Sequence, residues 1–192
     1  MLNETRIPGQ RVAITEDDNR TPSREWFRFF EYLYVTAVAS VTNAAFYDTT
    51  STAWAANTPT IVPVGNTYAT HGFTLASSRV TVVGAGRYVI NASFQLTNNN
   101  ASNDDDMTIW LRVNGANAIA SARRVTVPKQ HASVAGSVVM TASFMYTFAS
   151  GDYFKLYGLS KLGYAQIATY AASSSPAYPA APGTVVTVAQ IL

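Results

Sequence analysis

Residues 87–97 read RYVINASFQLT, and their side chains alternate between two kinds. Every second residue from Tyr88 to Leu96 is apolar, while Asn91, Ser93 and Gln95 stand between them. Successive side chains of a β-strand point to opposite faces of its sheet, so this is the pattern of a strand with one face in a core. We therefore predict a strand here and an all-β fold around it.

The same period recurs in residues 107–113, MTIWLRV, and in residues 137–148, SVVMTASFMYTF. In the first segment, Trp110 and Arg112 fall on the face opposite the apolar set, so we expect them to point away from the core. In the second segment, the outer face is itself only partly polar. A strand with that pattern is typical of burial against another subunit, and Trp110 and Arg112 are our candidates for such an interface.

Turn signals separate short segments of this kind from about residue 40 onward. The predicted strands are residues 44–47, 72–75, 79–83, 87–97, 107–113, 123–127, 137–148, 153–159 and 184–191. Turns such as Asn114-Gly115 supply the positive φ angles that tight connections need. This number of short strands indicates a sandwich, a jelly roll or a barrel, and the period does not choose between them.

Three motifs in order favour one topology. Residues 86–94, GRYVINASF, resemble the G-x-Y strand of C1q/TNF-like jelly rolls; residues 109–115, IWLRVNG, are similar to the family's N-G hairpin; and residues 148–156, FASGDYFKL, look like its G-D segment. Residues 184–192 fit the central C-terminal strand of that family. The resemblance implies a C1q/TNF-like jelly-roll sandwich over residues 39–192, assembly as a homotrimer, and no catalytic residues. In such a trimer, Trp110 and Arg112, which the alternation turns away from the core, are the candidates for the trimer interface.

A helix is predicted over residues 21–34, TPSREWFRFFEYLY. Thr21 can cap it, Pro22 suits the first helical position, and Glu25 lies near the positive end of the helix dipole. Aromatic and aliphatic side chains recur on one face at helical spacing: Trp26, Phe29, Phe30 and Leu33. Such a face packs on its own domain, on copies of itself, or on a partner protein.

The polar, irregular residues 1–20 precede this helix and predict an extended arm. Arm and helix together resemble the start of small virion proteins of tailed bacteriophages, the head or tail fibre and decoration proteins. The resemblance implies a virion protein whose residues 1–38 anchor it to the particle through Trp26, Phe29, Phe30 and Leu33. The partners of such a protein are other virion proteins. The resemblance leaves open whether the chain is attached to the capsid or to the tail.

Composition excludes several classes of protein. Only 12% of the residues are charged, the formal net charge is +2, and the basic residues are scattered, which argues against nucleic-acid binding. The chain has no cysteine, so disulfides and thiolate metal sites are absent. We see no apolar run long enough to span a membrane and no apolar signal-peptide region, and we expect neither membrane insertion nor a standard secretion signal.

Residue types that carry chemistry are sparse. His71 and His131 fall in predicted loops without a carboxylate at ligand spacing, and no nucleophile motif is present, so we expect a protein that is not an enzyme and has no cofactor. The cluster Asp104–Asp106, with Asn98–Asn100, offers oxygen ligands to Ca²⁺ but lacks the spacing of a calcium loop. We favour a solvated loop tip and predict no metal.

Aromatic residues outside the predicted core are the remaining candidates: Trp54, Tyr157, Tyr164, Tyr170 and Tyr178. Exposed, they would form a platform for sugars or proteins; packing within the domain or the trimer is the reading we favour. The sequence thus predicts a trimeric fibre or decoration protein whose knob adheres to a host surface. The alternatives are a tail-fibre protein that recognises cell-envelope glycan, a polysaccharide-degrading enzyme, and a secreted C1q-like binding protein.

Overall fold

The structure, a computed structural model, describes residues 24–39 and 42–191. The chain divides into two units, Met1–Val41 and Thr42–Leu192. In the first, helix α1 spans Arg24–Ala39. The sequence places its end at residue 34, but the helix continues for five more residues, because extending an existing helix costs far less than starting one. The proposed cap, Thr21, and the arm lie outside the described residues. No helix in the described ranges has the length and apolar character required to cross a membrane.

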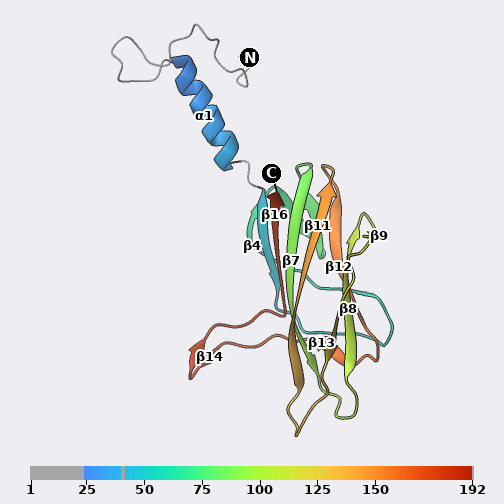
Figure 1. Cartoon of the computed structure of the whole chain (residues 1–192). Coiled ribbons are helices and arrows are strands. Elements are labelled where there is room, and N and C mark those ends of the chain that lie inside the picture. The colour runs from blue at the N-terminus through green and yellow to red at the C-terminus, as the bar shows by residue number, and fades with distance from the viewer. Residues whose placement is uncertain (1–23, 40–41, 192) are drawn as a thin grey trace. The chain divides into compact units, whose positions relative to one another are not determined.

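The second unit is built from two antiparallel sheets laid face to face (Figure 1). Within the described residues, the first sheet has the order β2-β13-β7-β16-β1-β4, with β11 on the other side of β7. Its strands are β1 Asn43–Asp48, β2 Thr52–Ala53, β4 Asn66–His71, β7 Gly86–Asn98, β11 Gly136–Phe148, β13 Ala165–Ile167 and β16 Thr184–Ile191.

The second sheet has the order β10-β8-β12-β6-β5, with β3 paired to β12 and β9 paired to β8. Its strands are β3 Thr60–Ile61, β5 Phe73–Ala76, β6 Arg79–Val82, β8 Asp105–Val113, β9 Ala116–Asn117, β10 Arg123–Val127 and β12 Tyr153–Ser160. All nine predicted strands are therefore present, most with ends shifted by one or two residues.

The core lies between the sheets and follows the period-two pattern of both. In β7 the side chains of Tyr88, Ile90 and Phe94 are fully buried, and in β8 Met107, Ile109 and Leu111 meet them from the other sheet. Burying side chains of this size stabilises the fold by roughly 1.5–3 kcal/mol each. Tyr88 also donates a hydrogen bond from its hydroxyl to the carbonyl of Gly84 (2.8 Å), so its one polar atom is satisfied in the interior.

Two long pairings define the first sheet. β11 pairs with β7 over the whole length of both strands, from Gly136↔Asn98 to Phe148↔Gly86. β16 lies between β7 and β1, as expected for a central C-terminal strand. These pairings set which outer side chains lie beside one another across the sheet.

The strands that sequence patterns missed are short or lack a buried face. Every side chain of β4 is exposed, and backbone pairing with β1 holds this edge strand in place, so no alternation marks it. A further small hairpin, β14 Ser173–Ser174 with β15 Ala177–Tyr178, projects away from the sandwich (Figure 1).

Candidate functional site

The outer side of β12 carries two tyrosines on either side of a lysine. Its buried and half-buried residues alternate strictly, which turns Phe154, Leu156 and Gly158 inward. Tyr153, Lys155 and Tyr157 consequently share the outer face of the second sheet. The sequence singled out only Tyr157 of these three.

Strand β8 places the predicted interface residues next to this group. Trp110 is paired across the strands with Tyr157, and Arg112 is paired with Lys155. The Trp110 and Tyr157 rings lie 6.0 Å apart, and the Arg112 guanidinium lies over the Tyr157 ring at 4.5 Å. The Trp110 indole Nε1 donates to Asn117 Oδ1 (2.9 Å). Trp110 and Arg112 thus point outward as predicted, and both have partners within their own sheet.

A tight turn closes one end of the group. Asn114 and Gly115 have φ angles of +49° and +84°, which suit the two-residue connection between β8 and β9. Their conformation brings the Gly115 carbonyl to the Arg112 side chain, whose Nη2 donates a hydrogen bond to it. A Cβ at Gly115 would lie 3.7 Å from the Tyr153 hydroxyl, so the turn also borders Tyr153.

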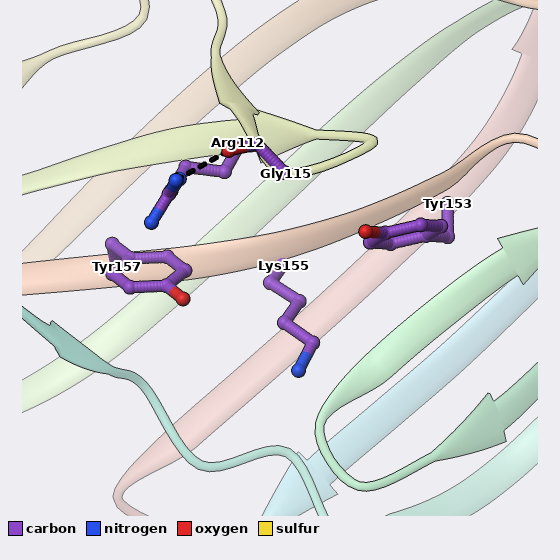
Figure 2. Close-up of a pocket in the computed structure, with 5 residues that line it drawn as sticks. All are labelled: Arg112, Gly115, Tyr153, Lys155 and Tyr157. Carbon is purple, nitrogen blue, oxygen red and sulfur yellow. Dashed lines mark hydrogen bonds between the residues drawn. The ribbon is translucent and has the colours of Figure 1, made fainter.

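Between these residues is a small open pocket of about 110 Å³ (Figure 2). It is lined by Arg112, Gly115, Tyr153, Lys155 and Tyr157. We call this the tyrosine–lysine pocket. Figure 2 shows the two tyrosine hydroxyls turned toward Lys155 from opposite sides. Beyond Tyr153, the guanidinium of Arg79 lies over that ring at 5.1 Å.

The pocket is rich in positive charge. Lys155 and Arg112 stand opposite each other across two strands, where like charges repel. Neither of them, nor Arg79, forms an ion pair with any residue in the ranges 24–39 and 42–191; the two ion pairs found there join Asp106 to Arg124 and Lys161. The Nε atom of Arg112 is buried without a hydrogen-bond partner among the same residues. The pocket therefore carries positive charge that no ion pair among the described residues offsets.

A buried carboxylate fixes the other end of the same sheet. Asp105, at the start of β8, is 1% exposed. It accepts hydrogen bonds from the Ser160 hydroxyl and from the backbone N–H groups of Leu162 (2.9 Å), Tyr164 and Ala165 (both 2.8 Å). Burial opposes its ionisation, but these donors outweigh that effect and hold the pKa of Asp105 below its ordinary value.

The other two carboxylates of the cluster have different partners. Asp104 accepts from the backbone N–H of Lys129 (2.8 Å), and Asp106 accepts from Thr126 (2.7 Å) and from Arg124. The Thr126 and Arg124 hydrogen bonds lower the pKa of Asp106. Asn98 and Asn100 bind backbone groups of their own loop. In the described part of the chain, no three His, Cys, Asp or Glu side chains come together as metal ligands.

Hydrogen bonds join the N-G motif of residues 109–115 to the G-D motif of residues 148–156. Asn114 Nδ2 donates to Asp152 Oδ1 (2.7 Å), and Asn114 Oδ1 accepts from the Tyr153 N–H (3.0 Å). The Asn114 hydrogen bond and a second from the Ala149 N–H lower the pKa of Asp152. These motif residues therefore position Tyr153 and the β8–β9 turn.

The structure places three further residues weighed in the sequence analysis. Trp54 is 4% exposed and packs close to Gly158, which agrees with the favoured interpretation that it packs within the domain. His71 ends strand β4 rather than lying in a loop, although it is exposed. His131 lies in a β-bridge with Val134, outside the named strands.

The other tyrosines are exposed but do not gather at the pocket. Tyr164, Tyr170 and Tyr178 lie along the connection from β12 to β16. Tyr170 lines a separate hollow of about 250 Å³ with Val138 and Val139 of β11. Only Tyr157 of the predicted set belongs to the tyrosine–lysine pocket.

The predicted anchor residues form an aromatic cluster on α1. Trp26, Phe29 and Phe30 have ring centroids 5.5–5.8 Å apart. Phe30 and Leu33 are 47% and 45% exposed. Within its unit, the helix thus presents this face at its surface.

The first sheet has a different outer face. Across it, Met145 pairs with Val89 and Val89 with Ala189; in a second row, Thr141 pairs with Ser93 and Ser93 with Val185. The segments 137–145, 89–95, 185–189 and 43–47 contain no charged residue, and we call their outer side the uncharged face. Met145 is 64% and Val139 60% exposed there.

No protein-family model matches the chain, and no curated protein matches it by sequence. Among solved structures, it is similar to a crystal structure of murine APRIL at pH 5.0. The TM-score is 0.51 at 11% identity, and the match covers 79% of this chain and 100% of that one. The chain thus has a TNF-like jelly-roll fold, an all-β sandwich preceded by a short helix, which confirms the predicted fold class.

Proposed function

We propose that this chain is a structural protein of a bacteriophage virion, a trimeric fibre or decoration protein. Residues 1–38 hold it on the particle, and the jelly roll of residues 39–192 is an exposed knob that adheres to the host surface. In this proposal the protein has no catalytic activity. The resemblance of the N-terminal segment to phage virion proteins supports the proposal that the chain belongs to a phage particle. The TNF-like fold fits a trimeric knob.

The uncharged face is the observation that best supports the proposed trimer. Exposed Met145 and Val139 stand on a sheet surface whose other outward side chains are uncharged, among them Val, Ala, Ser, Thr, Asn and Gln. Covering such a surface removes apolar area from water and desolvates no charge, which favours contact with another protein surface. In a closed cyclic trimer, the uncharged faces of three copies can meet around the threefold axis and cover one another.

This choice differs from the interface predicted from sequence. Trp110 and Arg112 already contact Tyr157, Asn117 and Gly115, and burying Arg112 and Lys155 in a subunit interface would desolvate two cations. We therefore propose that the uncharged face, in place of Trp110 and Arg112, forms the trimer interface.

The test of the trimer is light scattering coupled to size-exclusion chromatography. A mass three times 20.7 kDa at micromolar concentration is expected. A stable monomer at that concentration would contradict the trimer.

The anchor is tested on the helix itself. Phe30→Ser and Leu33→Ser change half-exposed side chains of α1, so the knob should fold normally. We expect the double variant to be lost from purified virions while the wild type is retained. Arg28→Gln, elsewhere on the helix, is the control. Equal incorporation of the variant and the wild type would refute the anchor.

A second candidate function is recognition of cell-envelope glycan by a tail-fibre protein. The tyrosine–lysine pocket favours it, because half-buried aromatic rings beside polar donors are common in sugar-binding sites. A polysaccharide-degrading enzyme is distinguished from both by a reducing-sugar assay on the purified protein, for which we expect no product.

A further inference from the structure

The tyrosine–lysine pocket holds unbalanced positive charge at a fixed place. Its Lys155 and Arg112 face each other across β12 and β8, and Arg79 lies over the adjoining Tyr153 ring. The acid nearest in sequence, Asp152, is already bound by Asn114 and by the Ala149 N–H. Like charges held opposite each other cost stability, and a bound anion would offset that cost.

The donors of the pocket suit one small anionic group. Both tyrosine hydroxyls turn toward Lys155 (Figure 2), and a Lys ammonium carries three donors. The volume of about 110 Å³ is large enough for a carboxylate, and the open side of the pocket leaves the rest of a ligand outside it.

Lys155 is the donor available to a ligand. Bidentate binding of an anion needs the planar fork of an arginine. Here Nη2 of Arg112 already donates to the Gly115 carbonyl, and the guanidinium is stacked on Tyr157. The remaining strong donor is Lys155, a point charge that can pair with one oxygen anion, and the comparison with acetate and phosphate below tests which anion it prefers.

The surroundings of the pocket suit a sugar ring attached to that carboxylate. Trp110, Tyr157 and Tyr153 form a half-buried aromatic strip on the sheet, and the pocket between them is open. Aromatic groups with an apolar body and a polar end are suited to the C–H and O–H groups of a pyranose.

We propose that the tyrosine–lysine pocket binds the carboxylate of an acidic saccharide, a uronic acid residue in a polysaccharide. Lys155 pairs with the carboxylate, the hydroxyls of Tyr153 and Tyr157 hydrogen-bond to it, and the aromatic strip carries the ring. The inference rests on the proposed role of the knob in host attachment and gives that role a ligand class.

The test is saturation-transfer NMR on the full-length protein. The probe is methyl glucuronide, and methyl glucoside, which carries a hydroxymethyl group in place of the carboxylate, is the matched neutral ligand. We expect saturable binding of the glucuronide with a Kd of about 1 mM, and binding of the glucoside at least about tenfold weaker. Raising the salt concentration should weaken the binding of the glucuronide and leave the binding of the glucoside unchanged.

Variants test whether the glucuronide binds at this pocket. Lys155→Gln should lower the affinity for the glucuronide by about tenfold or more, and Lys155→Arg should retain most of it. Lys129→Gln removes the same charge from an exposed site elsewhere on the second unit and should leave binding unchanged. The thermal unfolding of each variant shows that it is folded.

Three results would overturn the proposal. They are equal binding of glucoside and glucuronide, equal losses in Lys155→Gln and Lys129→Gln, and binding of acetate or phosphate as tight as that of the glucuronide. The pocket lies within one chain, so its binding is independent of the oligomeric state. A trimer that fails to bind glucuronide refutes this inference alone, and a monomer that binds it refutes only the proposed assembly.

Discussion

The two sheets of the sandwich have the same antiparallel construction and opposite outer surfaces. The uncharged face presents rows such as Met145, Val89 and Ala189, whereas the second sheet presents Arg79, Arg112 and Lys155 beside its tyrosines. The inner faces of both sheets supply apolar side chains to one shared core. Alternate residues of a strand serve different faces, so the core constrains only half of each strand and leaves the other half for function.

The chemistry of each outer face indicates what it contacts. Small uncharged side chains can be covered by protein at little desolvation cost, which suits the trimer interface. Lysine and arginine are costly to bury without partners, which keeps the second sheet toward solvent and its ligands. Four predictions test this division.

The largest effect is expected from Asp105→Ala, beneath the charged sheet. The substitution removes the acceptor for the Ser160 hydroxyl and for three backbone N–H groups that fix the connection after β12. We expect the free energy of unfolding to fall by about 3–5 kcal/mol, measured by chemical denaturation at fixed protein concentration. A loss below about 1 kcal/mol would show that the connection is held by other contacts.

The next effect concerns assembly through the uncharged face. Met145→Asp places a carboxylate in every copy of the proposed interface, while the exposed site leaves the folded chain intact. The dissociation constant of the trimer should rise by at least about 100-fold in sedimentation experiments. Lys155→Gln on the other sheet should leave it unchanged. If Lys155→Gln weakened the trimer and Met145→Asp did not, the result would support Trp110 and Arg112 as the trimer interface.

Acid should weaken the charged sheet first. The pKa values of Asp105, Asp106 and Asp152 lie below the ordinary value of 3.8, and all three residues belong to β8 or to the turn before β12. A lowered folded-state pKa stabilises the protein above about pH 4, and the contribution is lost as the pH falls through the folded-state pKa. As the pH is lowered to 3, the backbone amides of β8 and β12 should therefore lose protection from hydrogen exchange before those of β7 and β11. Uniform exchange across both sheets would contradict this order.

The smallest effect is expected on the free energy of unfolding when the repulsion between Lys155 and Arg112 is removed. Without ligand, Lys155→Gln removes the like-charge pair with Arg112 and should raise the free energy of unfolding by about 0.5 kcal/mol at low salt. The gain should vanish at high salt, because screening already weakens the repulsion. A gain that persists at high salt would point to packing instead.

The sequence alone determined the strands that have one buried face. Alternation in residues 87–97 and 107–113 predicts β7 and β8, and the Asn114-Gly115 pair predicts the turn between β8 and β9. The predictable elements share one cause: the period of two arises within a single strand, from the geometry of its own backbone. The same period turns Tyr153, Lys155 and Tyr157 to one side.

Only the tertiary structure decided what lies next to those residues. The register that sets Arg112 beside Lys155 and Trp110 beside Tyr157 joins strands some forty residues apart in sequence. Trp54 is buried for the same kind of reason, since it packs close to Gly158 of β12, a residue far from it in sequence. Cross-strand neighbours depend on how the whole chain pairs its strands, and no local pattern records that pairing.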